Sequence, residues 1–554
     1  MGRNLNEDSI TFSSKARTIV WVLGISVCFS GCRMPASQHE KPGVPTAQEK
    51  VLRSARQTIA GNFSSQTKLH FDSSALEDFL GKYPEFASYS PDLKRFYDGR
   101  KYAYAWYDSN GLIEQAGNLF NRFQHINQEG LTLTLPYSVP FRALMEGTDS
   151  SFQKDPRNPE AELMLTAQYF SYARHVWQGI GEDESRRTDW FLSRKKLDLE
   201  ALMDSLLRHP EKSFSSGEPV YRQYGLLKAF LNKYRTIDSA GGWQPIVFEK
   251  KSYKVGDSVK NVSDIKKRLF ASGDYVGDTA SFLFTTDLEE AVKTFQQTRG
   301  LEEDGIIGRA LIDQMNIPPA EIIEKILLNM ERARWVPVSL QGDYLVVNIP
   351  AFKLYVYRND SLLWDMNIVA GKPLHETVIF NGDLKYIVFS PYWNVPQSIF
   401  KNEILPGMKK DPEYLTKHNM EKVGNNSVRQ RPGPNNSLGQ VKFLFPNSYN
   451  IYLHDTPSKS LFSKSNRAFS HGCIRLGEPK KLAMYLLRGN TEWTERKIDA
   501  AMNSGTEKYV TLQKPVPVFI AYFTAWIGRE GKLNLRPDIY NRDHRLAEMM
   551  IAQN

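Results

Sequence analysis

The spacing of apolar residues changes near Tyr344, and this change limits the folds that the chain can adopt. Before that point apolar residues recur every three or four positions, as at Leu76, Phe79 and Leu80, which predicts amphipathic helices. After it, short runs rich in β-branched and aromatic residues, such as residues 352–357, 448–454 and 516–526, predict strands, and Asn359-Asp360-Ser361 predicts a hairpin turn. The sequence therefore predicts an α+β multidomain fold, with a helical N-terminal scaffold and a mainly β C-terminal domain.

The 554 residues suggest about three domains, since one domain usually holds roughly 100–200 residues. A small unit with three helical faces separates the two large parts, and a long stretch around Pro406 and Gly407 interrupts the β region. Insertions of that length commonly act as lids or binding loops. The predicted division is a helical scaffold domain at 69–250, a three-helix domain at 255–316, a connecting helix at 317–338, and a β domain at 340–545 with an inserted lid at 399–445.

The N-terminus has the pattern of an export signal. Lys15 and Arg17 precede an apolar run at 18–30, whose length is typical of a signal peptide. Small residues just before Cys32 resemble a bacterial lipobox, although Phe29 replaces the usual Leu. We expect residues 1–32 to be a lipoprotein-type signal that leaves a lipidated Cys32, or else an uncleaved signal anchor, followed by a flexible tether at 33–68. Either outcome predicts a periplasmic body attached to a membrane.

The chain is basic, with a formal net charge of +9. A basic surface favours polyanions, anionic lipid head groups or carboxylate-rich polymers, without choosing among them. Because the sequence has no Lys/Arg-rich run and no nucleic-acid motif, nucleic acid is the weakest of these partners.

The positions of the three cysteines limit the kinds of site that the folded body can contain. Cys28 and Cys32 lie in the N-terminal segment, so Cys473 is alone in the rest of the chain. This excludes a disulfide framework and a four-cysteine metal site in the folded body. A single thiol in an exported enzyme is a candidate nucleophile, and the alternative is a small buried apolar residue.

Two histidines could activate this thiol. A free thiol has a pKa near 8.5, so little thiolate forms at neutral pH unless an imidazole takes the proton. His454 ends a predicted strand, and sheet pairing could bring it beside Cys473. His471 is two residues from Cys473, but the Gly472 turn leaves its direction open. A zinc site made by these three side chains is a weaker interpretation, since one cysteine does not make a usual structural site.

The turn at Gly472 suggests a further element of the chemistry. A glycine permits a sharp turn, in which the N–H groups of Gly472 and Cys473 could converge as an oxyanion hole. Arg475 could hold a substrate carboxylate with two hydrogen bonds, or it could form an ion pair with Glu478.

The motif Ser470-His471-Gly472-Cys473-x-Arg475, preceded by His454, resembles the signature of the YkuD-type L,D-transpeptidase domain. The unit at 255–316 resembles a three-helix peptidoglycan-binding domain, with an Asp-Gly-x-x-Gly turn at 304–308 before its last helix. The segments 392–396, 429–434, 442–446 and 453–457 extend the resemblance to the large YcbB-type members, over most of residues 70–545.

The resemblance implies a reaction on peptidoglycan stem peptides. Cys473 would attack the bond between an L-centre of diaminopimelate and a terminal D-alanine, hold the acyl group as a thioester, and pass it to the side-chain amine of another diaminopimelate. The product would be a 3→3 cross-link, with His454 as the general base and acid. The insertion would cap the substrate, carbapenems would acylate the thiol, and no metal or organic cofactor is implied. The residues matching the substrate groove are Trp393, Tyr452, Ser470, His471 and Arg475.

Two other functions stay open at the level of sequence. If water accepted the acyl group, the protein would be an L,D-carboxypeptidase that trims tetrapeptide stems, because acceptor choice depends on groove shape and water exclusion. The chain could instead be a non-catalytic wall-binding scaffold, although the presence of both Cys473 and His454 argues against that function.

Overall fold

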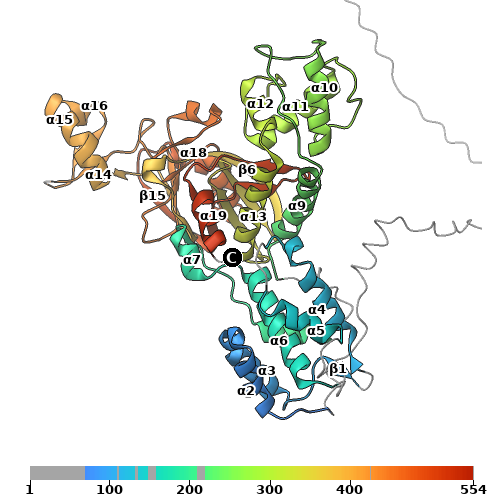
Figure 1. Cartoon of the computed structure of the whole chain (residues 1–554). Coiled ribbons are helices and arrows are strands. Elements are labelled where there is room, and N and C mark those ends of the chain that lie inside the picture. The colour runs from blue at the N-terminus through green and yellow to red at the C-terminus, as the bar shows by residue number, and fades with distance from the viewer. Residues whose placement is uncertain are drawn as a thin grey trace, which may run out of the picture. The chain divides into compact units, whose positions relative to one another are not determined.

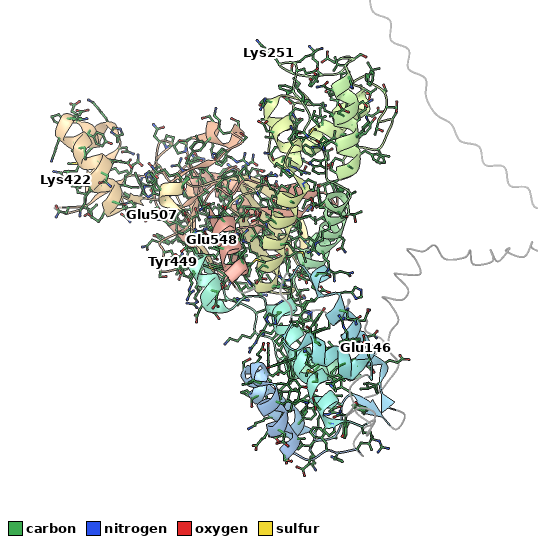
Figure 2. All side chains as sticks on the ribbon, viewed as in Figure 1. Glu146, Lys251, Lys422, Tyr449, Glu507 and Glu548 are labelled. Carbon is green, nitrogen blue, oxygen red and sulfur yellow. The ribbon has the colours of Figure 1, made fainter. Side chains whose placement is uncertain are left out.

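The computed structural model describes residues 69–108, 111–131, 135–147, 157–208, 219–424 and 426–552. Figure 1 shows their ribbon and Figure 2 adds their side chains. The predicted signal at 1–32, including Cys32, and the tether at 33–68 lie outside the described residues. Within the described part, no helix combines the length and the apolar character needed to cross a membrane.

The N-terminal part is helical, as the apolar spacing predicts. Its central helix α6 (Pro159–Ala173) is buried around its whole circumference, and Asn158 caps it by accepting a hydrogen bond from the Glu160 N–H at 2.8 Å. The other helices are α2 (Ser74–Lys82), α3 (Ser90–Gly99), α4 (Glu114–Gln124), α5 (Ser138–Met145), α7 (Glu182–Arg187), α8 (Leu199–Arg208) and α9 (Gln223–Ser239), with short strands β1 (Tyr107–Asp108), β2 (Gly111–Leu112) and β3 (Trp190–Phe191).

A small helical unit follows, with a hydrophobic core of its own. It consists of α10 (Lys260–Ser272), α11 (Thr286–Arg299) and α12 (Arg309–Met315). Gly273 ends α10 in the left-handed region at φ 81°, which a glycine adopts without strain. Helix α13 (Pro319–Trp335) then leads into the sheet, in agreement with the predicted connecting helix.

The C-terminal part is built on a sheet that closes on itself. Its strands run in the order β11-β12-β14-β6-β5-β4-β15-β7, and β11 also pairs with β7. Around it lie β13 (Ala468–Ser470), the hairpin β16 (Ala525–Ile527) and β17 (Leu533–Leu535), and helices α17 (Pro479–Leu487), α18 (Glu495–Met502) and α19 (Arg542–Ala552). The closed sheet contains β4 (Asp343–Asn348), β5 (Lys353–Arg358), β6 (Ser361–Gly371), β7 (Ile379–Phe389), β11 (Val441–Leu444), β12 (Leu453–His454), β14 (Ile474–Leu476) and β15 (Lys508–Ala521).

The insertion, predicted at 399–445, begins earlier and contains a separate small core, formed by Val395, Phe400, Ile404 and Val428. Its predicted end was wrong, because residues 441–444 pair with β7 and β12 as strand β11 of the closed sheet. Figure 2 labels Lys422 within this segment. Its elements are β8 (Trp393–Asn394), α14 (Gln397–Ile399), η6 (Phe400–Ile404), α15 (Leu405–Lys410), α16 (Tyr414–Lys417), β9 (Met420–Lys422) and β10 (Val428–Gln430).

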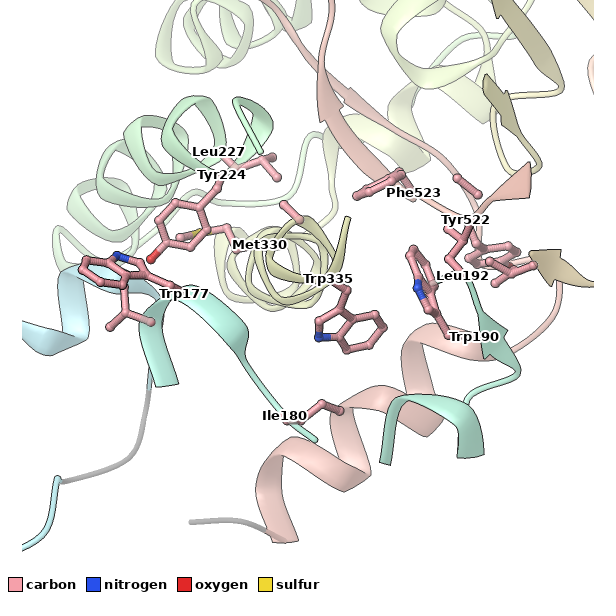
Figure 3. Close-up of a cluster of buried hydrophobic side chains, with 14 of the residues drawn as sticks. Trp177, Ile180, Trp190, Leu192, Tyr224, Leu227, Met330, Trp335, Tyr522 and Phe523 are labelled. Carbon is pink, nitrogen blue, oxygen red and sulfur yellow. The ribbon is translucent and has the colours of Figure 1, made fainter. Parts of the chain in front are cut away.

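The helical scaffold and the sheet share one hydrophobic core around α13 (Figure 3). Trp190 of β3 packs edge-to-face on Trp335 of α13 at 5.0 Å and on Phe523 at 6.1 Å. In addition β3 pairs in parallel with β7, so a scaffold strand extends the sheet. The hydrophobic spacing of the sequence does not predict this strand, because two residues are too few to show a period.

Two predicted strands differ from the observed ones. The run 448–454 forms only the two-residue strand β12, because Asn450 adopts a left-handed φ of 55° and Asn447 Oδ1 accepts from the Tyr449 and Ile451 N–H groups. Asparagine favours such turns. The run 516–526 breaks after Ala521, because Asn348 and Asn329 accept the N–H groups of residues 523 and 524 in place of a neighbouring strand.

Candidate active site

Cys473 and His454 lie at the junction of two parallel strands. β12 pairs with β14 in the register Leu453↔Ile474 and His454↔Arg475, and the Ile474 N–H donates to the Tyr452 carbonyl at 3.2 Å. Because side chains alternate along a strand, Tyr452 and His454 lie on the same face of the sheet as Cys473 and Arg475. The ladder therefore brings together four residues that the sequence separates by about twenty positions.

His454 is a buried, neutral base. His454 is only 4% exposed. This burial, together with the nearby charges of Arg475 and Lys442, lowers the pKa of the imidazole to about 3. Its Nδ1 lies 2.5 Å from the Asp455 carbonyl oxygen. A carbonyl only accepts hydrogen bonds, so Nδ1 carries the proton and Nε2 keeps its lone pair. This tautomer can accept a proton at Nε2.

The thiol of Cys473 is protonated at rest. Burial raises its pKa, while the Tyr452 hydrogen bonds and the charge of Arg475 oppose this shift. The sulfur accordingly donates a hydrogen bond to the Asn450 carbonyl oxygen at 3.7 Å. We expected from the sequence that an imidazole would make this sulfur anionic. The structure instead describes a neutral thiol and a neutral imidazole, because burial of each group disfavours its charged form.

Because of the turn at Gly472, the side chains of Cys473 and His471 point in different directions. Its φ of 110° is a conformation that only glycine adopts readily. His471 consequently faces the insertion, where its Nε2 lies 3.2 Å from Glu403 Oε1, and its ring lies 5.1 Å from that of His375. His471 thus belongs to the contact between the motif and the insertion.

The side chain of Ser470 stabilises the turn with two hydrogen bonds to its backbone. Its Oγ accepts from the Gly472 N–H at 3.2 Å and donates to the Cys473 carbonyl at 2.5 Å. Of the two oxyanion-hole donors expected from the sequence, the Gly472 N–H is therefore already engaged at rest. The Cys473 N–H is the remaining backbone donor of the turn.

Arg475 places a half-buried cation near the thiol. Burial lowers the pKa of its guanidinium, and no partner for its buried Nε is found among the described residues. Glu478, the ion-pair partner considered from the sequence, lies 3.1 Å from Lys481 instead. A half-buried guanidinium whose buried Nε donor is open is suited to a carboxylate ligand.

Trp393 lies in β8 at the base of the insertion and packs against the insertion's small core. The structure thus divides the predicted groove residues between the sheet and the insertion. Sequence reasoning missed Asn450 and Glu403. The Asn-rich stretch at 447–450 was a signal for the turn that carries Asn450, whereas nothing local singles out Glu403.

Three families match separate parts of the chain. Residues 342–499 match YkuD, described as "L,D-transpeptidase catalytic domain", and residues 91–231 match a family described as "Scaffold domain". Residues 258–315 match one described as "Putative peptidoglycan binding domain". These matches confirm the predicted resemblance and the three-part fold class.

One curated relative, from Haemophilus influenzae (strain ATCC 51907 / DSM 11121 / KW20 / Rd), is named "Putative L,D-transpeptidase". It is 34% identical over 247 residues, which cover 41% of this chain and 50% of the relative. The chain thus spans half the length of this relative.

Two solved structures are L,D-transpeptidases by title. That from Stackebrandtia nassauensis is 12% identical, covers 50% of this chain and 97% of its own, and has a TM-score of 0.23. That from Mycobacterium smegmatis is 18% identical, covers 32% and 58%, and has a TM-score of 0.19. At TM-scores this low, neither structure supports an argument about this chain.

Proposed function

Since the chain carries a YkuD L,D-transpeptidase catalytic domain, we propose that it forms 3→3 cross-links between peptidoglycan stem peptides through a Cys473 thioester. The observation that carries this proposal is the parallel pairing of β12 with β14, which sets His454 and Cys473 on one face of the sheet. A lone thiol beside a neutral imidazole is the arrangement that nucleophilic acyl transfer requires.

In the first half-reaction, His454 Nε2 takes the proton of the Cys473 thiol as the sulfur attacks the carbonyl carbon before the terminal D-alanine. The Cys473 N–H donates to the oxyanion that forms. The tetrahedral intermediate collapses, the C–N bond breaks, and His454 returns its proton to the amine of the leaving D-alanine. Because thiol and imidazole are both neutral at rest, the proton moves only as the bond to the substrate forms.

In the second half-reaction, the side-chain amine of another diaminopimelate attacks the thioester. His454 accepts the proton of this amine and then protonates the departing thiolate. If water attacked instead, the product would be a tripeptide monomer, and the protein would be a carboxypeptidase. The insertion, which meets His471 through Glu403, would favour the amine by covering the thioester from water.

Arg475 is proposed to bind a carboxylate of the stem peptide, because its buried Nε has no partner among the described residues. Tyr452 and Trp393 would line the same groove, and carbapenems would acylate the same thiol. Their acyl carbonyl would then occupy the position of the stem-peptide carbonyl.

The unit at 258–315 is proposed to hold the protein on the wall. Its loops expose Val276 at 90% and Phe282 at 50%. Exposed apolar side chains of this kind mark binding surfaces. Changing both to Asp should weaken sedimentation with purified sacculi, whereas Val139→Asp on the scaffold, itself 78% exposed, serves as the matched control. Equal sedimentation of the two variants would contradict this role.

Attachment to a membrane through a lipidated Cys32 is also proposed. Mass spectrometry of the wild-type protein should find a lipidated Cys32 as the first residue, whereas Cys32→Ser should keep residues 1–32 because lipidation and cleavage are both blocked. A wild-type protein that itself keeps residues 1–32 at the membrane would point to a signal anchor instead.

The central experiment incubates purified protein with tetrapeptide muropeptides and identifies the products by mass spectrometry. Cross-linked dimers with release of D-alanine are expected. Tripeptide monomers alone would replace the proposal by the carboxypeptidase, and unchanged substrate would favour the wall-binding scaffold.

A further inference from the structure

A buried hydroxyl holds the carbonyl group of Gly472, although the proposed reaction does not use it. Thr377 is fully buried, and its Oγ1 donates to the Gly472 carbonyl oxygen at 2.9 Å. The same Oγ1 accepts from the Gly371 N–H at 3.0 Å. Since the hydroxyl has one proton to donate and accepts another, these two bonds fix its orientation.

The carbonyl of Gly472 and the N–H of Cys473 belong to one peptide unit. That unit is planar, and in the trans form its C=O and N–H point in opposite directions. Thr377 therefore fixes the direction of the Cys473 N–H by holding the Gly472 oxygen. A hydrogen bond to the carbonyl also polarises the peptide, which strengthens the N–H as a donor.

A second layer holds Thr377 in place. The Tyr540 hydroxyl donates to the Gly371 carbonyl at 2.6 Å and accepts from the Thr377 N–H at 3.4 Å. The Tyr540 N–H in turn donates to the Tyr522 hydroxyl at 2.9 Å, which donates to Asp538 at 2.5 Å. The chain of bonds thus runs from the segment before α19 to the peptide that precedes the thiol.

The loop between Gly371 and Thr377 also lies against the turn. The carbonyl oxygen of Glu376 is 3.7 Å from the position that a Gly472 side chain would take. Arg542, at the start of α19, binds the Glu376 carboxylate at 2.8 Å. The loop that carries Thr377 is thereby held by α19 as well as by Tyr540, which supports the position of the Thr377 hydroxyl against the Gly472 peptide.

We propose that Thr377 is a positioning residue for acyl transfer, whose hydroxyl aims the Cys473 N–H at the developing oxyanion, with Tyr540 holding Thr377. This inference rests on the proposed function, since an oxyanion forms only if Cys473 attacks a carbonyl group. Thr377 does not touch the substrate and acts through the peptide alone.

The test compares two reactions of the same thiol in the full-length protein. Acylation by a carbapenem passes through an oxyanion, whereas alkylation by iodoacetamide does not. In Thr377→Val, which keeps the shape but loses the hydroxyl, the acylation rate constant should fall about 10- to 100-fold. The alkylation rate constant should stay within about threefold, because the thiol and His454 are unchanged. Thr377→Ser should restore acylation to within a few-fold of the wild type.

Tyr540→Phe provides a second variant, and it should lower acylation several-fold without changing alkylation. If Thr377→Val does not fold, Tyr540→Phe alone tests the proposal. Equal losses of acylation and alkylation, or no loss in either variant, would overturn the positioning role. If the wild-type protein itself were neither acylated nor active on muropeptides, the proposed function would fail first, so the two failures are distinguishable.

Discussion

His454 ends strand β12 and Cys473 directly precedes the neighbouring strand β14 of the closed sheet, whereas Glu403, which lies 3.2 Å from His471, belongs to an insertion with its own small core. Backbone ladders and a shared core hold the first region. Four buried side chains and exposed ion pairs, such as Lys417–Asp411, hold the second. Exposed pairs contribute only about 0–1 kcal/mol each. The comparison teaches that backbone pairing and a large core position the candidate reacting groups, whereas the insertion depends on a small core of its own.

The largest effect should come from the sulfur itself. Cys473→Ala should form no covalent adduct with a carbapenem and no cross-linked dimers, because the described residues hold no other free cysteine. Intact-protein mass spectrometry measures the adduct. An adduct on the Cys473→Ala protein would contradict the assignment of the nucleophile.

His454→Ala should slow acylation about 10²- to 10⁴-fold, since a positioned general base contributes roughly that factor. His418→Ala is the matched control, because His418 is an exposed histidine of the insertion. Stopped-flow measurement of carbapenem acylation gives both rates. If the two variants slowed the reaction equally, the contrast between sheet and insertion would be lost.

Acid should destabilise the sheet through His454. Its folded pKa is about 3, below the ordinary value near 6.5, so between these values the unfolded chain binds a proton that the folded protein does not. The free energy of unfolding contributed by this group therefore falls as the pH drops from 6.5 towards 3. Between pH 7 and 4.5, His454→Gln should lose roughly 2–3 kcal/mol less stability than the wild type.

Urea unfolding at the two pH values measures this difference directly. A His454→Gln protein that lost as much stability as the wild type would show that His454 is accessible to protons in the folded state. The difference between the sheet and the insertion would then depend only on their packing and hydrogen bonds.

The smallest effect should come from the insertion. Glu403→Gln removes a charge beside His471 and should raise the KM for stem peptides a few-fold, with kcat and carbapenem acylation within about threefold, because the pair is exposed. Glu413→Gln, another exposed carboxylate of the insertion, is the control. A large drop in kcat for Glu403→Gln would mean that the insertion takes part in the chemistry.

Much of the fold could be read from apolar spacing. The helix at 319–335, the three-helix unit and the strands β4 to β6 follow patterns long enough to show a period, and the Asn359-Asp360 turn lies where its residue types indicate. Asn450 was placed wrongly in a strand, because a two-residue strand has no period. The scaffold strand β3 was missed for the same reason, since pairing with β7 alone makes it a strand.

The sequence by itself determined which groups can react: one thiol, an imidazole on an earlier strand, and a glycine whose φ only that residue type adopts readily. These are properties of single residues and their neighbours. Only the tertiary structure decided that His454 is neutral, that the thiol is protonated, and that Thr377 holds the Gly472 peptide across 95 positions. Desolvation and long-range hydrogen bonds depend on what surrounds a group in space, and a local pattern of residues does not contain that information.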